Sequence, residues 1–233
     1  MNETPAIQVA NLTKVYGGGH TEVVAVREAA LTVQHGELAA LLGPSGGGKT
    51  TLLTAIALIN PPTTGQIYID SRLVMDGPYA KVNVRTFRRQ HIGYVFQSAN
   101  LIPFLSAREN VQIAMELDGL GSRVARKRTL ELLEYLGVAE RAEHYMAALS
   151  GGEQQRVAVA RSLANEPSVI LADEPTASLD SQRGRQVIDL FRKVTHERGA
   201  GILVVTHDHR MLDLFDTIYE MEDGRVRVQR ERG

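Results

Sequence analysis

The sequence predicts an α/β fold with a largely parallel central sheet, and three observations support this prediction. Residues 168–173 and 200–207 are almost continuously apolar, which is typical of strands buried on both faces of a parallel sheet. Residues 182–199 between them have helical spacing and end in Gly199, so they predict a crossover helix. Residues 37–59 read as a strand, a glycine-rich loop and a second helix. This order of elements favours the α/β class.

Length, net charge and residue composition exclude several classes of protein. The 233 residues suffice for one large domain, or for a core with a subdomain. A formal net charge of −1 gives no electrostatic footprint for nucleic acid, so we expect no nucleic-acid partner. The absence of cysteine excludes disulfides and thiolate zinc sites. Residues 1–14 are too polar for a signal peptide and the longest apolar stretch, residues 52–59, is too short for a membrane span, which predicts a cytoplasmic location.

The N-terminal part of the chain is predicted to contain strands on both sides of one helix. Residues 7–16 alternate as a strand does, and residues 23–43 predict two further strands that are broken near Gly36. Helical spacing follows over residues 49–59, and residues 65–70 are a short β-rich run. We expect the N-terminal strands to form an antiparallel β portion beside the parallel sheet.

The middle of the chain is predicted to be helical. A short β-rich run at residues 91–97 precedes a segment of helical texture that extends to about residue 166. Within residues 126–137, three leucines are predicted to share one helical face: Leu130, Leu133 and Leu136. We therefore expect a single domain over residues 1–233 with a core and an inserted helical subdomain. The predicted bounds are 1–97 and 166–233 for the core and 98–165 for the subdomain.

The glycine-rich loop carries the most specific motif. Residues 43–50 (GPSGGGKT) match the pattern G-x-x-x-x-G-K-S/T between a predicted strand and a predicted helix. Without Cβ atoms in the way, backbone N–H groups can converge on phosphate oxygens at a helix N-terminus. Lys49 would reach the β- and γ-phosphates and the Thr50 hydroxyl would bind Mg²⁺. The predicted nucleotide-binding residues of this loop are Gly43, Pro44, Ser45, Gly46, Gly47, Gly48, Lys49, Thr50 and Thr51.

Two carboxylates follow the apolar strand at residues 168–173. Asp173 and Glu174 lie at its C-terminal tip, where an open α/β sheet places its ligand crevice. We expect Asp173 to hold Mg²⁺ through water and Glu174 to polarise the attacking water. The alternative, an exposed turn completed by Pro175, is less favoured beside a phosphate-binding loop.

A second predicted helix also begins with small residues, which leave its N-terminal backbone accessible to an anion. Ser150, Gly151 and Gly152 come directly before the predicted helix that contains residues 153–163. One nucleotide does not need two such helix N-termini from one chain. A helix capped by Ser150 does not by itself explain two glycines. We therefore expect this second N-terminus to serve a nucleotide held by another copy of the chain.

Residues 149–153 (LSGGE) resemble the signature of ABC-transporter ATPases, and other motifs follow in the order typical of that family. Tyr16 resembles the residue that stacks on adenine, and Gln97 resembles the glutamine that senses the γ-phosphate and the metal. Residues 178–180 (SLD) resemble the loop that couples the two sites of a dimer, and His207 resembles the switch histidine that contacts the γ-phosphate. The likeness extends over essentially the whole chain. Glu153 is a departure, because the signature usually has glutamine there.

The resemblance implies a fold and a composite site. The fold would be α/β: a P-loop NTPase (ABC ATPase) core with an antiparallel β portion and an inserted helical subdomain. The function would be ATP hydrolysis by a homodimer closed around two ATP, with Mg²⁺ as the second cofactor. The implied catalytic residues are Glu174, His207 and Gln97, and the implied metal ligands are Thr50, Gln97 and Asp173. The other implied nucleotide-binding residues are Tyr16 of one copy and Ser150, Gly151, Gly152, Glu153 and Asp180 of the other.

Three segments are most similar to one branch of the family. Residues 92–111, 171–180 and 204–226 resemble the ATPases of lipoprotein release, macrolide export and heterocyst-glycolipid export, and the DevA type of the last group most of all. The resemblance implies an integral membrane permease subunit as partner and leaves open a periplasmic adaptor. It places the chain peripherally on the inner face of the cell membrane, in an exporter or a mechanotransmission complex.

Several interpretations stay open on the sequence. Residues 100–105 (NLIPFL) suit either the core or a groove that receives the membrane subunit. Residues 81–91 are basic and suit a solvated face better than a surface for anionic lipid. Residues 207–209 (HDH) have no evident third metal ligand, so only His207 is given a role.

Two other functions are also open. One is a regulatory module that acts through a membrane partner on cell-wall enzymes without transport. The other is a nucleic-acid-linked ABC ATPase, which is less favoured because the chain lacks a second cassette, a long coiled coil and a zinc module.

Overall fold

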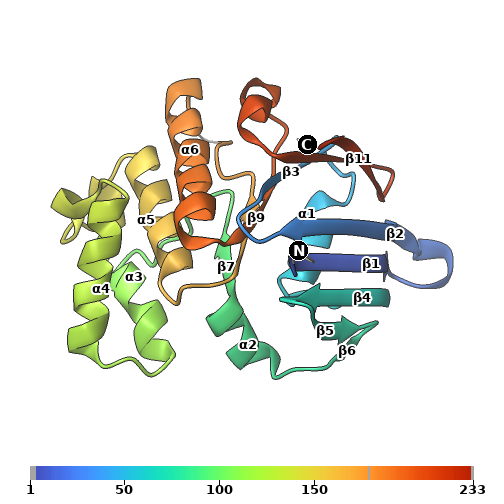
Figure 1. The fold of residues 1–233 in the computed structure, drawn as a ribbon, viewed down its shortest axis with the longest axis horizontal. Helices are drawn as coiled ribbons and strands as arrows, with labels where there is room; N and C mark the ends of the chain where they lie inside the picture. Colours follow the sequence, from blue (N-terminus) through green and yellow to red (C-terminus); the bar gives the residue numbers. More distant parts are fainter. Residues whose placement is uncertain (1–3, 178, 232–233) are drawn as a thin grey trace.

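The computed structural model describes residues 4–177 and 179–231. They form two β-sheets and a group of helices (Figure 1). In Figure 1 the antiparallel sheet lies at one end of the molecule and helices α3, α4 and α5 lie together at the other. This arrangement confirms the predicted fold class.

The antiparallel sheet has the strand order β2-β1-β4-β5-β6. Its strands are β1 (Pro5–Tyr16), β2 (Val23–Gln34), β4 (Thr64–Ile69), β5 (Arg72–Asp76) and β6 (Tyr79–Ala80). The predicted strands at residues 7–16 and 65–70 and the first of the two predicted over residues 23–43 are confirmed. Strands β5 and β6 were not predicted, because both are short and β6 is exposed.

The second sheet has the order β11-β10-β3-β9-β8-β7 and is parallel from β10 to β7. Its strands are β3 (Leu38–Leu42), β7 (Ile92–Val95), β8 (Val169–Asp173), β9 (Gly201–Val205), β10 (Thr217–Glu222) and β11 (Arg225–Glu231). All residues of β3 and β9 are buried, as their apolar sequences predict. Strands β10 and β11 extend the sheet beyond the predicted strands, with β11 antiparallel to β10.

The parallel sheet separates two apolar cores. Leu38 and Leu42 of β3 pack with the helices α5 (Gly151–Leu163) and α6 (Ser181–Arg198). Leu41 points the opposite way, into a core shared by α1 (Lys49–Ile56) and the antiparallel sheet. Helix α1 therefore lies between the two sheets (Figure 1). Helix α6 is the predicted crossover helix and ends at Gly199, which has φ of +68°.

The helical subdomain contains α3 (Ala107–Leu117), α4 (Ser122–Tyr135) and α5. Ser106 and Ser150 begin α3 and α5 with capping boxes that involve Glu109 and Glu153. The predicted apolar face of α4 is partly wrong. Leu133 and Leu136 are buried, but Leu130 is 38% exposed and Leu132 takes its place in the core.

The remaining helices are short. Helix α2 (Val84–His91) occupies most of the basic segment and buries only Phe87. The 3₁₀ helices are Gly19–Thr21, Ala139–Arg141, Met146–Ala148 and His209–Leu214 (η1 to η4). No helix within the described residues is both long enough and apolar enough to span a membrane.

Candidate nucleotide-binding and hydrolysis site

The phosphate loop connects β3 to α1 and packs closely against strands β2 and β10. Gly43 has φ of +143°, and a Cβ atom there would lie 2.0 Å from the carbonyl oxygen of Met221. Gly48 has φ of +97°, and its Cβ would lie 2.1 Å from the carbonyl oxygen of Ala25. Only glycine combines these conformations with these contacts. These glycines therefore allow the loop to lie directly against the backbone of β2 and β10 at the start of α1.

Lys49 holds this loop from within. Its side chain is buried, and Nζ donates hydrogen bonds to the carbonyl oxygens of Gly43 (2.9 Å) and Pro44 (2.8 Å). An ammonium group has three donors, so one remains for a ligand. The positive charge is thus fixed beside the N-terminus of α1, where an anion is favoured.

Thr50 and Asp173 form the part of the site that suits a divalent cation. The Thr50 hydroxyl donates to Asp173 Oδ1 at 3.2 Å. Burial raises the pKa of Asp173; Glu174 raises it further, while the Thr50 hydrogen bond and Lys49 lower it. Mg²⁺ prefers such oxygen ligands and needs few of them, because phosphate oxygens and water complete its shell. The described residues contain no cluster of three or more His, Cys, Asp or Glu side chains that could hold a metal ion.

Glu174 and His207 lie at the ends of neighbouring strands β8 and β9. His207 Nδ1 is 3.2 Å from Glu174 Oε2, and the Glu174 N–H donates to the carbonyl oxygen of Val205 at 2.9 Å. Glu174 has φ of +45°, an uncommon conformation for a residue with a side chain. A carboxylate fixed in this way beside an imidazole can accept a proton from water.

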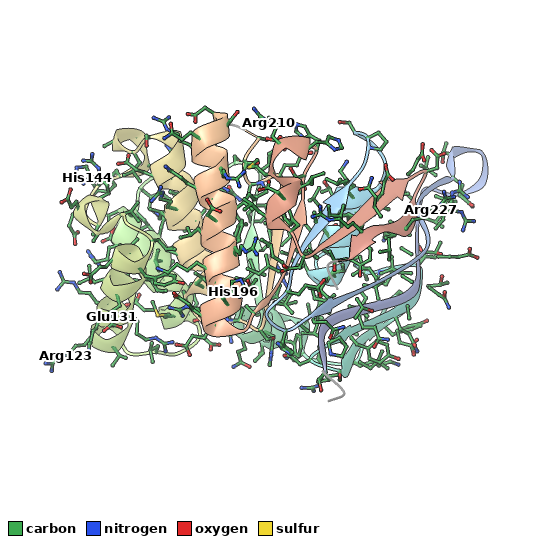
Figure 2. All side chains as sticks on the ribbon, turned by 45° about the horizontal axis from the view of Figure 1, so that its top comes forward. Arg123, Glu131, His144, His196, Arg210 and Arg227 are labelled. Atoms are coloured by element: carbon green, nitrogen blue, oxygen red, sulfur yellow. The ribbon has the colours of Figure 1, made fainter. Side chains whose placement is uncertain are left out.

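Asp208, which follows His207 in the HDH stretch, has other partners. Asp208 caps η4 and pairs with Arg210, whose guanidinium also donates to Ser181. Arg210 thereby connects η4 to the start of α6 (Figure 2).

A cleft of about 390 Å³ brings together much of the phosphate loop with Gln97, Asp173 and Glu174. It is lined by Ala25, Ser45, Gly46, Gly48, Lys49, Thr50, Thr51, Gln97, Asp173 and Glu174. Ala25 was not predicted, because an apolar strand residue carries no chemical signal. His207 reaches the cleft only through Glu174.

Tyr16 lies outside the residues that line this cleft. It ends β1, is 42% exposed, and its hydroxyl accepts a hydrogen bond from Asn60. Lys14 Nζ lies 5.1 Å from the centre of the Tyr16 ring. The ring is accessible to a stacking partner, but its role in adenine binding stays a prediction.

The segment that carries Gln97 is held by side chains from helix α5. Gln155 donates to the carbonyl oxygen of Phe96 at 3.4 Å. Arg161 donates to the carbonyl oxygens of Ala99 (3.1 Å) and Asn100 (3.0 Å), and burial lowers its pKa. These contacts could not be predicted from the sequence, since they join residues about 60 positions apart. They connect the Gln97 segment to the helix that begins with the signature.

The signature residues lie apart from the cleft and against the start of α6. Ser150 Oγ accepts from the Glu153 N–H at 3.4 Å, and Glu153 Oε2 accepts from the Ser150 N–H at 2.8 Å. Cβ atoms built on Gly151 and Gly152 would lie 3.7 Å from Leu179 Cδ2 and 3.6 Å from Arg183 Cδ, which are ordinary contacts.

The loop after β8 leads into α6. Asp180 caps α6 by accepting from the Arg183 N–H at 2.9 Å. Ser178, in the predicted coupling loop, lies outside the described residues.

The apolar stretch at residues 100–105 divides between core and surface. Leu101 is 5% exposed, whereas Phe104 is 76% exposed. Asn110 fixes the backbone between them, since its side-chain amide accepts from the Ile102 N–H and donates to the carbonyl oxygens of Ile102 and Leu105. Neither of the two open interpretations therefore applies to the whole stretch.

These features define an ATP-binding and hydrolysing domain with a phosphate loop, and comparison with known proteins identifies its class. The model of the family described as ABC transporter matches residues 26–177, so the chain belongs to the ABC transporter family. It is an ABC-transporter ATP-binding subunit, an ATPase whose cofactors are ATP and Mg²⁺.

The relatives support the predicted branch. The lipoprotein-releasing system ATP-binding protein LolD of Zymomonas mobilis is 40% identical over 220 residues, which cover 94% of each chain. The macrolide export ATP-binding/permease protein MacB of Hyphomonas neptunium is 39% identical over 222 residues, which cover 95% of this chain but 34% of MacB. The chain is therefore similar to the LolD and MacB branch. These relatives give the DevA type no support.

A solved structure shows the same fold in a dimer. The dimeric ATP-binding cassette MJ0796 of Methanocaldococcus jannaschii, bound to ADP and Pi, has a TM-score of 0.87 and 38% sequence identity, covering 97% of this chain and 99% of that one. The chain therefore shares the fold of this cassette.

Proposed function

We propose that two copies of the chain close around two Mg-ATP molecules, each lying between the phosphate loop of one copy and the start of α5 of the other. The observation that carries this proposal is the separation of the two anion-binding features, because residues 150–153 do not line the phosphate-loop cleft. A glycine in a helix costs about 1 kcal/mol relative to alanine. The surroundings of Gly151 and Gly152 within the chain leave room for a Cβ atom, so packing inside the chain does not require glycine at either position. Glycine at both positions therefore suits a ligand that approaches from outside the chain.

Within each site, different residues would bind the phosphates, the base and the metal. The phosphate loop and Lys49 bind the β- and γ-phosphates, and Tyr16 offers an exposed ring to the base. Thr50, Asp173 and Gln97 supply oxygens for the metal. When bound, Mg²⁺ withdraws charge from the phosphate oxygens.

For hydrolysis, Glu174 accepts the proton of the attacking water while the water oxygen bonds to the γ-phosphorus and the bond from that phosphorus to the ADP oxygen breaks, so that ADP leaves. His207 Nδ1 lies 3.2 Å from Glu174 Oε2 and holds that carboxylate, and the His207 side chain is 65% exposed, which leaves its ring available for the γ-phosphate. The proton therefore moves from water to Glu174 Oε, while the positive charges around the phosphates stay in place.

We further propose that ATP-driven closure works on a membrane permease, as part of an exporter or mechanotransmission complex peripheral to the inner face of the membrane. The similarity to LolD and MacB supports this, as do the exposed aromatic rings of Phe96 and Phe104 on either side of Gln97. Exposed apolar side chains on the segment that carries Gln97 suit a contact that transmits motion. A periplasmic adaptor stays a prediction.

A Glu174→Gln variant tests the dimer. The amide cannot take the proton from water, so turnover should stop while ATP binding persists. We expect this variant to be dimeric in Mg-ATP by light scattering, whereas the nucleotide-free wild type is mainly monomeric. Glu131→Gln on the exposed face of α4 (Figure 2) is the matched control and should hydrolyse ATP normally. A Glu174→Gln chain that stays monomeric in saturating Mg-ATP contradicts the proposal.

A further inference from the structure

Helix α5 begins with a negative charge at the place where the proposed dimer brings a triphosphate. Glu153 is the third residue of α5, and its Oε2 accepts from the Ser150 N–H at 2.8 Å. A carboxylate in the first turn is attracted by the same partial positive charge that attracts a phosphate. Glu153 therefore competes with an incoming nucleotide.

Protonation does not remove this charge near neutral pH. The hydrogen bond from the Ser150 backbone, followed by that from the Arg141 side chain, lowers the pKa of Glu153 to about 2. The other means of cancelling the charge is a cation, and Arg141 Nε lies 2.8 Å from Glu153 Oε1. Among the ion pairs of the described residues, this is the only one that Glu153 makes.

The stability of the fold does not account for the pair. The Arg141 and Glu153 side chains are 45% and 26% exposed, and exposed ion pairs contribute little to folding. A glutamine at the third position would complete the capping box equally well. What the pair changes most is the charge at the start of α5.

The remaining donors at this helix start are unused. The N–H groups of Gly151 and Gly152 make no hydrogen bond within the described part of the chain. They are the first two N–H groups of the helix, which cannot be satisfied within it. With the Glu153 charge cancelled, they are available to an anion.

We propose that Arg141 is a positioning residue that neutralises Glu153, so that the start of α5 can approach the triphosphate held by the phosphate loop of a second copy. This rests on the proposed two-copy site. Without Arg141, the carboxylate repels the polyphosphate and the closed dimer forms less readily. The chain's own phosphate loop is unaffected, because neither Arg141 nor Glu153 lines its cleft.

The dissociation constant of the Mg-ATP dimer tests this role, measured by analytical ultracentrifugation in the Glu174→Gln background. At about 0.05 M NaCl we expect Arg141→Ala to raise the constant roughly tenfold, and at about 0.5 M NaCl the loss should shrink because salt screens the repulsion. Arg141→Lys keeps the positive charge and should recover most of the affinity. Arg141→Ala combined with Glu153→Gln should also recover it, since the repelling charge is gone.

A matched control lies at the other end of the same helix. Arg128 pairs with Glu166 just beyond the end of α5, so Arg128→Ala removes an ion pair far from the signature and should leave the dimer unchanged. If Arg141→Ala dimerises as well as its parent at low salt, or if Glu153→Gln fails to restore it, the role of Arg141 is wrong. If the Glu174→Gln parent itself does not dimerise, the two-copy site is wrong and the role of Arg141 falls with it.

Discussion

The hydroxyl of Thr50 lies 3.2 Å from the carboxylate of Asp173, although the two residues are 123 positions apart in the sequence. Thr50 is in the first turn of α1, which follows β3, and Asp173 is the last residue of β8. Both strands are hydrogen-bonded to β9 in the parallel sheet, so their C-terminal ends meet at one edge. The sheet thereby assembles an oxygen-rich site between two parts of the chain that have no local connection.

Replacing Asp173 by asparagine should stabilise the nucleotide-free fold while it removes the metal site. Burial raises the pKa of Asp173 above that of the unfolded chain, so the native state favours the protonated form. That favourable contribution is present at low pH and is lost as the pH rises through the folded pKa. Asp173→Asn should therefore raise the melting temperature by about 2–4 °C at pH about 7.5. The gain should shrink toward pH about 4. Turnover with Mg-ATP should fall about a hundredfold.

The pH dependence distinguishes this effect from a general change in packing. A gain in melting temperature that is equal at both pH values would mean that the Asp173 charge is not its source. A variant that melts below the wild type would show that the Thr50–Asp173 hydrogen bond outweighs the cost of burial.

Lys49→Ala should lose ATP binding. The substitution removes the cation from the phosphate loop together with the two hydrogen bonds that Nζ donates to Gly43 and Pro44. We expect the dissociation constant for Mg-ATP to rise roughly 10- to 100-fold by calorimetry, because charge-assisted hydrogen bonds are the stronger kind. Lys127→Ala, which removes an exposed lysine of α4, is the control and should bind normally. Unchanged affinity in Lys49→Ala would contradict the assignment of the phosphate loop.

Ser150→Arg should act on the partner's nucleotide and spare its own. The added bulk at the start of α5 should block closure, while Mg-ATP affinity at the phosphate loop of the same chain stays within about twofold. Ser150→Ala is the control, because it removes the cap of α5 and adds no bulk. Mixed with Lys49→Ala, the Ser150→Arg chain can form at most one intact composite site per heterodimer, so part of the ATPase activity should return. Loss of ATP affinity in Ser150→Arg alone would mean that the signature acts within one chain.

The sequence was sufficient for the phosphate loop and for the strands that carry it. The motif at residues 43–50 is local, and β3, β9 and the part of β8 before Asp173 are apolar because both faces of the sheet are covered. Leu130 shows the limit of such patterns. Its spacing suits the buried face of α4, but the rotation of the helix against its neighbours turns Leu132 inward instead.

Contacts between distant residues could not be predicted in the same way. The pairs Glu174–His207 and Arg141–Glu153 form because the fold places two separate segments of the chain side by side. Residue type alone does not select these partners. The division of residues 100–105 into core and surface depends likewise on the side chain of Asn110, which fixes the backbone of Ile102 and Leu105.

Phe104 provides the test of the membrane partner. It is 76% exposed, so Phe104→Asp should leave the melting temperature and the Mg-ATP affinity of the isolated chain nearly unchanged. The charged side chain should nevertheless prevent a permease from packing against this surface, and the variant should fail to co-purify with the membrane subunit from gently solubilised membranes. Leu101→Asp is the matched control, because Leu101 is 5% exposed and a buried, unpaired carboxylate should unfold the domain. If Phe104→Asp binds the membrane subunit as the wild type does, the contact surface lies elsewhere on the chain.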